Sequence, residues 1–178
     1  MRALLLAATL VAGLGVGATG WAGPAAVEVV DERDFQALGD EAEARDLPIL
    51  VMFSSPFCSY CETVEEDFLV PMLKSGDYDN RVLIRKVGMI VGGREVTDFS
   101  GETVTVDDLA ARYDITLTPT VVFLDSEGQR LADNLVGLTT TAYYGGYLDD
   151  GIDMALKRLG RVEAALAQAG EEPGRMVD

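Results

Sequence analysis

The chain has 178 residues, a formal net charge of −16 at neutral pH, two cysteines and no histidine. Its length suits one domain with or without a tail, and so acidic a surface disfavours nucleic acid and anionic membranes as partners. The absence of histidine excludes hydrolases with a histidine base, most zinc and copper sites, and histidine pH switches. We therefore expect any protein partner to present a neutral or basic face.

Residues 1–22 have the pattern of a secretory signal peptide. Arg2 supplies the positive end, "ALLLAATLVAGLGVGA" is apolar, and "GWA", ending at Ala22, fits a small-x-small cleavage site. An uncleaved membrane anchor is the alternative, which the glycines and the short length disfavour because a spanning helix needs about 20 strongly apolar residues. We expect a periplasmic protein with a signal peptide at 1–22, one domain at 23–170 and a flexible tail at 171–178.

The first half of the domain predicts alternating strands and helices. Continuous apolar runs such as "PILVMFSS" are typical of strands covered on both faces, whereas apolar residues three or four positions apart indicate a helix face. A proline inside such a pattern kinks or ends the helix because it lacks a backbone N–H. In chain order we expect a strand at 25–30, a helix within 31–46, a strand at 48–55, a helix from 58 that Pro71 kinks or ends, and a strand at 81–88.

The second half predicts a terminal hairpin and a final helix. The segment 89–104 is glycine-rich and polar, which predicts a loop or small excursion. Thr105, with Asp108 three positions later, is typical of a capped helix start. The further elements are a helix at 105–114, a strand at 118–125, a turn at 126–129, a returning strand at 130–137 and a helix at 139–160 that 161–170 extends. This order predicts an α/β fold with a mixed central sheet and helices on both faces.

Both cysteines lie in "FSSPFCSYC", between a predicted strand and a predicted helix. Cys58 and Cys61, three positions apart on a helix, can form a disulfide across its first turn. Unpaired N–H groups and the dipole at the helix N-terminus favour a thiolate at Cys58, which is the nucleophile. Cys61 can then attack the mixed disulfide and release the partner. The spacing therefore predicts thiol–disulfide exchange at this pair.

Other uses of the cysteine pair fit less well. Zinc needs four ligands, usually cysteine or histidine, and the chain has two cysteines and no histidine. An inert structural bridge would close a loop too small to constrain the unfolded chain much. Copper chaperones of the Sco type use Cys-x-x-x-Cys and a distal histidine, and both are missing here. We expect no metal and no cofactor.

The segments "FSSPFCSYC" and "LTPTVVFLDSEGQRL", together with the order of elements, resemble the thioredoxin superfamily over about residues 27 to 159. The resemblance implies a thioredoxin fold in which Pro119 is a cis proline beside the cysteines and the backbone of Thr118 pairs with the substrate chain. A trans Pro119 at the start of a strand is the alternative. Tyr60, inside the cysteine motif, is expected to tune the pair or to shape the docking surface.

One position departs from the family pattern. Many thioredoxins carry a buried Asp or Glu six residues before the first cysteine, where it assists proton transfer near the second cysteine. This chain has Met52 there. Glu62 and Glu65 are candidates to take over the role, with water as another possibility, and a solvated helix face is the alternative reading of both carboxylates.

Within the superfamily, "CSYC", "GGREVTDFSGE" and "LAARYDITLTPTVVFLD" are similar to the SoxW-like periplasmic thioredoxins. This similarity implies a reductant of exported proteins that receives electrons from a membrane thiol transporter of the DsbD or CcdA type. One alternative is a disulfide oxidant or isomerase of the Dsb type. Another is a thioredoxin-fold binding or chaperone module whose cysteines are inert.

Overall fold

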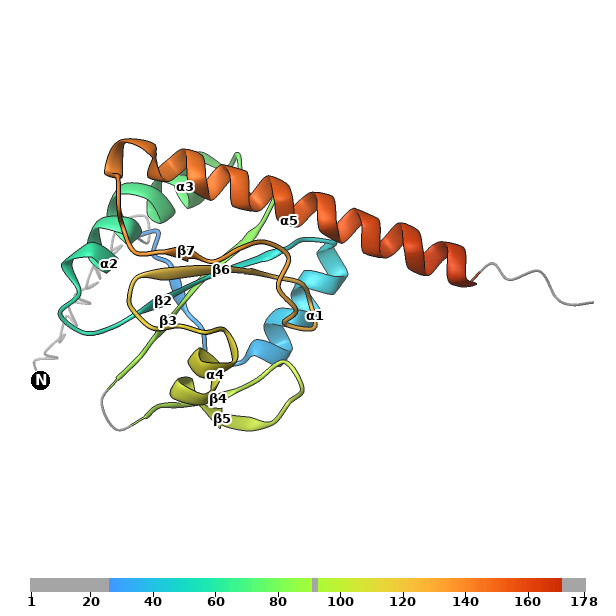
Figure 1. Cartoon of the computed structure of the whole chain (residues 1–178), viewed down its shortest axis with the longest axis horizontal. Coiled ribbons are helices and arrows are strands. Elements are labelled where there is room, and N and C mark those ends of the chain that lie inside the picture. Colours follow the sequence, from blue (N-terminus) through green and yellow to red (C-terminus); the bar gives the residue numbers. More distant parts are fainter. Residues whose placement is uncertain (1–25, 91–92, 171–178) are drawn as a thin grey trace, which may run out of the picture.

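A computed structural model describes residues 26–90 and 93–170 (Figure 1). The expected signal peptide at 1–22 and tail at 171–178 lie outside the described residues. The elements in chain order are β1 (Val30–Asp31), α1 (Phe35–Arg45), β2 (Ile49–Ser54), α2 (Ser59–Val64), the π-helical turn η1 (Glu65–Leu69), α3 (Val70–Ser75), β3 (Leu83–Gly88), β4 (Glu95–Thr97), β5 (Thr103–Thr105), α4 (Val106–Arg112), β6 (Thr120–Leu124), β7 (Leu135–Val136) and α5 (Thr141–Gly170).

A five-stranded mixed sheet forms the centre of the molecule, with the strand order β1-β3-β2-β6-β7. β2 is the middle strand, since it pairs in parallel with β3 and antiparallel with β6. The helices α2, α3 and α5 lie on one side of the sheet, and α1 and α4 lie on the other (Figure 1). The predicted α/β fold with a mixed sheet and helices on both faces is confirmed.

The side chains of β2 alternate between two hydrophobic cores. Leu50 and Met52 belong to the core under α2, α3 and α5. Ile49, Val51 and Phe53 belong to the core under α1 and α4. All five residues are 0% exposed, and successive side chains of a strand point to opposite faces. The continuous apolar run in the sequence therefore reflects a strand that is covered on both sides.

The helix after the cysteines continues past Pro71 as far as Ser75. It accommodates the proline with the π-helical turn η1, which adds one residue to a helical turn just before α3. The three- and four-residue spacing of Cys61, Val64, Phe68 and Met72 predicts one buried helix face. The added residue rotates this face, so that Leu69 is fully buried and Phe68 is only half-buried. Periodicity alone placed the face correctly before the π turn but missed this rotation.

The segment 89–104 contains a β-hairpin, so the structure agrees with the predicted small excursion and not with an irregular loop over the whole segment. β4 and β5 pair antiparallel as a separate two-stranded sheet. Val96 anchors the hairpin in the core under α1 and α4. Strands of three residues are too short to show a clear alternation of apolar and polar residues.

Two further strands are shorter than predicted. β1 comprises only Val30 and Asp31, so it overlaps the strand predicted at 25–30 at Val30 alone. The returning strand predicted at 130–137 is reduced to β7, whose Val136 pairs with Thr120, plus an isolated bridge nearer the turn.

The final helix α5 packs its first half against the sheet and then projects beyond it (Figure 1). Its buried side chains recur at three- and four-residue steps and are Tyr144, Leu148, Ile152 and Ala155. The predicted extension of this helix through 161–170 is confirmed. Within the part of the chain that the structure describes, no helix is both long and apolar enough to cross a membrane.

Candidate active site

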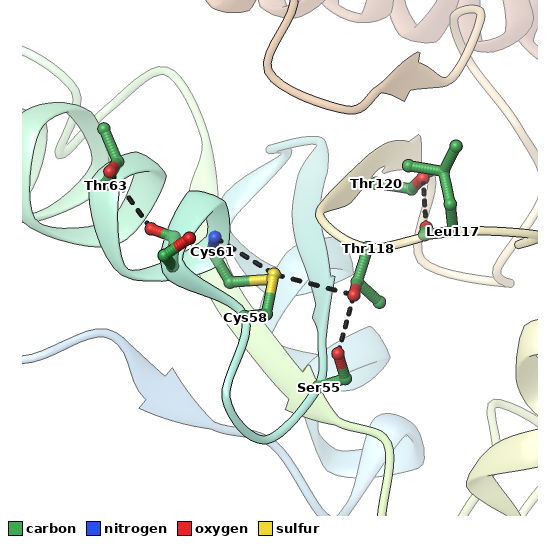
Figure 2. Close-up of a disulfide and its surroundings, with 8 residues drawn as sticks. Ser55, Cys58, Cys61, Thr63, Leu117, Thr118 and Thr120 are labelled. Atoms are coloured by element: carbon green, nitrogen blue, oxygen red, sulfur yellow. Dashed lines mark hydrogen bonds between the residues drawn. A yellow bond between two sulfur atoms is a disulfide. The ribbon is translucent and has the colours of Figure 1, made fainter.

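The turn between β2 and α2 holds both cysteines (Figure 2). Phe57 has a φ of 62°, in the left-handed region, where the backbone turns from the strand into the helix. Cys58 is the N-cap residue of α2, and its carbonyl accepts hydrogen bonds from the N–H groups of Cys61 and Glu62. Cys58 therefore stands at the junction between the central strand β2 and the first turn of the helix.

Cys58 and Cys61 form a disulfide across that first turn, with their Cα atoms 5.2 Å apart. The N–H of Cys61 also donates to the Sγ of Cys58 at 3.2 Å. Cys58 is half-buried, whereas Cys61 is only 4% exposed. The difference follows from helix position, because Cys61 lies on the face turned to the core. A partner protein therefore has readier access to the sulfur of Cys58.

Thr118 lies opposite the disulfide (Figure 2), and Pro119 follows it in the chain. The peptide bond between them is cis, and the carbonyl of Pro119 accepts a hydrogen bond from the N–H of Gly137 at 2.8 Å. The hydroxyl of Thr118 donates to the Sγ of Cys58 at 3.6 Å. Among the described residues, neither backbone polar group of Thr118 has a hydrogen-bond partner. These groups are thus free to pair with another chain.

Ser55 is a site residue that the sequence did not reveal. Its hydroxyl lies 2.7 Å from the hydroxyl of Thr118, which is 63 positions away in the chain. A threonine hydroxyl has one hydrogen, so Ser55 must be the donor to Thr118 when Thr118 donates to Cys58. Two aligned hydroxyls stabilise negative charge on the Cys58 sulfur. In the sequence Ser55 is only a turn-forming residue after a strand.

Met52 lies in the core next to α2, 0% exposed and directly across from Lys86 on β3. The Nζ of Lys86 pairs with a carboxylate oxygen of Glu65 at 2.5 Å. Glu65 lies four positions after Cys61, on the same helix face, and its side chain is 21% exposed. Glu62 is exposed. Of the two candidate carboxylates, only Glu65 is therefore held in a half-buried ion pair near Cys61.

Four exposed apolar side chains, which we name the apolar rim, gather around the disulfide: Phe57, Tyr60, Leu117 and Val136. Phe57 and Tyr60 flank Cys58, and Leu117 precedes Thr118. Tyr60 is 62% exposed and belongs to the surface. Grouped exposed apolar side chains are typical of a protein docking surface.

No group of three or more His, Cys, Asp or Glu side chains among the described residues could hold a metal ion.

A family model described as a thioredoxin-like domain matches residues 35–152. Among solved structures, a DsbH oxidoreductase is 19% identical, with a TM-score of 0.49 and coverage of 82% of this chain and 95% of that one. A thioredoxin-fold protein from Helicobacter pylori is 21% identical, with a TM-score of 0.44 and coverage of 68% and 86%. Wild-type thioredoxin h from poplar is 23% identical, with a TM-score of 0.42 and coverage of 64% and 84%. No curated protein matches the chain.

The match to the family model carries the assignment. It covers about two thirds of the chain, from the start of α1 into α5, and includes both cysteines, Thr118 and Pro119. The chain belongs to the thioredoxin-like domain family, and its cysteine pair within that fold supports thiol–disulfide oxidoreductase activity.

Proposed function

We propose that the protein is a periplasmic thiol–disulfide oxidoreductase that reduces disulfides in exported proteins. The main support is the unequal burial of the pair, with Cys58 accessible beside Thr118 and Cys61 buried behind it. Cys58 is then the nucleophile, Cys61 the resolving cysteine, and Thr118, Pro119 and Tyr60 the residues that bind the partner chain. The signal-like pattern of 1–22 supports export.

The proposed reaction has two exchange steps. The Cys58 thiolate attacks one sulfur of the target disulfide, and the other target sulfur leaves as a thiolate and takes up a proton. Cys61 then loses its proton and attacks the Sγ of Cys58, which breaks the bond to the target and releases the second target thiolate. Two electrons pass to the target, and the protein is left with the Cys58–Cys61 disulfide.

The second step needs an acceptor for the Cys61 proton, and we assign this role to Glu65. The ion pair with Lys86 holds the Glu65 carboxylate one helical turn from Cys61. A hollow of about 530 Å³ beside this pair gives the proton a route to solvent. The charged groups that line it are Glu28, Glu62, Glu65, Glu66, Lys74 and Lys86.

The reduced pair must be regenerated by another dithiol. A membrane thiol transporter of the DsbD or CcdA type is the proposed donor, supported by the similarity to SoxW-like proteins. The net charge of −16 supports protein rather than nucleic-acid partners.

The direction of exchange follows from how strongly the Cys58 thiolate is stabilised. Strong oxidants of the DsbA type have potentials near about −120 mV, whereas thioredoxin reductants lie near about −270 mV. The helix N-terminus and the Thr118 hydroxyl stabilise the thiolate here, but the motif lacks histidine and the exposed Glu62 and Glu66 oppose negative charge. Equilibration with a dithiol buffer should give a reducing potential. A value more positive than about −160 mV would instead favour the oxidant alternative.

A Cys61→Ser variant tests the roles of the two sulfurs. Without the resolving thiol, the variant should accumulate a covalent complex between Cys58 and its target in the periplasm, visible on a non-reducing gel. Cys58→Ser is the matched control and should trap nothing. Wild-type protein should also catalyse insulin reduction. A pair that never cycles in this assay would leave only the binding-module alternative.

A further inference from the structure

A shallow apolar groove of about 220 Å³ lies between β7 and α5. Its walls are Leu135 on β7 and Tyr147 and Met154 on α5, and the ring of Phe123 lies at its base. Tyr147 and Met154 are about half exposed although both are large apolar side chains. Gly151 lets the helix approach the sheet here, because a Cβ at that position would lie 2.3 Å from the Phe123 ring.

The groove is continuous with the site around the disulfide. Val136 is exposed and pairs with Thr120, and the next residue, Gly137, donates its N–H to Pro119. Leu117 lies against Gly137, since a Cβ placed there would be 3.6 Å from the Leu117 side chain. The backbone of β7 thus links the site to the groove, with the side chain of Leu135 on the groove side of the strand and that of Val136 on the opposite face. The base of the groove is four residues along β6 from Pro119, or about 13 Å at about 3.3 Å per residue.

β7 is one of the two edge strands of the sheet. An edge strand has backbone N–H and C=O groups that can pair with an added extended chain. A polypeptide that meets Thr118 beside Cys58 can therefore continue along β7 and place a side chain in the groove.

The charge at the groove is of one sign. Asp133 and Asp150 line it, no lysine or arginine does, and neither carboxylate forms an ion pair with a residue in 26–90 or 93–161. The cations Lys157 and Arg158 come one turn beyond Met154. A second copy of this chain, with its net charge of −16, would meet like charge here. A basic segment would meet opposite charge.

We propose that this groove is a second substrate-binding subsite, which deepens and rests on the proposed function. It takes an apolar side chain about four positions from the reactive cysteine of an extended target segment, and it prefers targets with Lys or Arg beside that side chain. The subsite selects basic, disulfide-bonded stretches of polypeptide over acidic ones.

The test uses extended peptides with one cysteine capped by a chromogenic aromatic thiol, whose release reports attack by the reduced protein. One peptide carries leucine flanked by lysines four positions from the cysteine. The others move the leucine by two positions, replace it with serine, or replace the lysines with glutamates, and each set is made on both sides of the cysteine. With the leucine on one side of the cysteine, the leucine–lysine peptide should react at least tenfold faster than the other peptides. Its advantage over the glutamate peptides should shrink in salt, which screens the interaction of the lysines with the carboxylates of the groove.

Protein variants locate the effect in the groove. Asp150→Lys should abolish or reverse the lysine preference, and Tyr147→Ser should abolish the leucine preference. Asp107→Lys, on an exposed position of α4, is the matched control and should keep both preferences. Thermal melting checks that each variant is folded.

Reduction of the uncharged bis(2-hydroxyethyl) disulfide separates the proposed subsite from the proposed oxidoreductase function. This small molecule cannot reach from the cysteines to the groove, so every folded variant should reduce it at the wild-type rate. Equal rates for all peptides, with this reduction intact, would overturn the subsite and leave the proposed function standing. Failure of wild-type protein to reduce either kind of substrate would overturn the proposed function itself.

Discussion

Met52 occupies a buried position whose only charged cross-strand neighbour is Lys86. We expect Met52→Asp to destabilise the fold by about 2 kcal/mol, because burying a carboxylate is costly and Lys86 offsets only part of that cost. Leu50→Asp is the matched control, since Leu50 is equally buried on the same face but lies across from Ile84. Leu50→Asp should lower the free energy of unfolding, measured in urea, by at least about 4 kcal/mol. Equal losses would mean that Lys86 does not reach the new carboxylate.

Glu65 can be tested by the rate at which the mixed disulfide resolves. Glu65→Gln cannot accept the Cys61 proton, so resolution at neutral pH should slow by about tenfold or more. The rate in this variant should then rise with pH as hydroxide takes over, whereas the wild-type rate should change less. Stopped-flow decay of a preformed mixed disulfide measures both.

The control for this experiment is Glu62→Gln, which removes a charge from the same helix at an exposed position. It should leave both the rate and its pH profile unchanged. If both variants slow resolution equally, the effect belongs to the local charge and not to Glu65 as a proton acceptor.

At the scale of single residues, the sequence predicted the members of the candidate site that are encoded locally. The cysteine spacing and the threonine–proline pair are short patterns, and the structure brings Cys58, Cys61, Thr118 and Pro119 together. The contacts of Ser55 with Thr118 and of Glu65 with Lys86 join distant segments. Nothing in the sequence beside Ser55 signals such a contact, because only the folded sheet creates it.

Among the elements, the β4–β5 hairpin depends on one buried carboxylate. Asp98 is 1% exposed and accepts hydrogen bonds from the Ser100 hydroxyl, the N–H of Glu102 and the guanidinium of Arg112. The hydrogen bonds from the Ser100 hydroxyl, the Arg112 guanidinium and the backbone N–H groups of Glu102 and Ser100 lower the pKa of Asp98 from 3.8 to about 2, against desolvation, which raises it. The carboxylate thereby ties the hairpin turn to α4.

This lowered pKa predicts a pH-dependent contribution to stability. The folded pKa is below the unfolded one, so the contribution is fully present above about pH 4 and is lost as the pH falls towards about 2. Asp98→Asn should therefore lose about 2 kcal/mol at neutral pH, and its deficit relative to wild type should vanish near pH 2. Asp107→Asn, on the exposed side of α4, should change stability by less than about 0.5 kcal/mol. Urea unfolding at several pH values measures both differences, and a deficit independent of pH would contradict the assignment.

Element prediction succeeded where one physical cause dominated the sequence. β2 is covered on both faces and reads as an unbroken apolar run, and the helix start at Thr105 is visible because its capping box is local. The β4–β5 hairpin was not predicted, because tertiary contacts such as the packing of Phe99 on Phe35 hold its strands in place. The π-helical turn was not predicted, because a change of helical period over five residues is too brief to detect from the spacing of apolar residues.

For the whole molecule, the proposed location requires that the signal peptide be removed. Mass spectrometry of the protein recovered from the periplasm should give Gly23 as the first residue. Deletion of residues 2–22 is the control and should leave the protein in the cytoplasm with its cysteines reduced. An intact N-terminus on membrane-bound protein would favour the uncleaved anchor instead.

The central position of β2 has a consequence for measurement in solution. Its amide hydrogens, from Ile49 to Phe53, lie between two paired strands and under two cores, so they should exchange with deuterium only when the whole domain unfolds. The turn at 55–58, which β2 carries directly, should exchange through local opening. Deuterium uptake in the oxidised and reduced protein therefore separates the two effects of the disulfide. A change within β2 reports its effect on global stability, and a change confined to the turn reports the freedom of the cysteines to meet a partner.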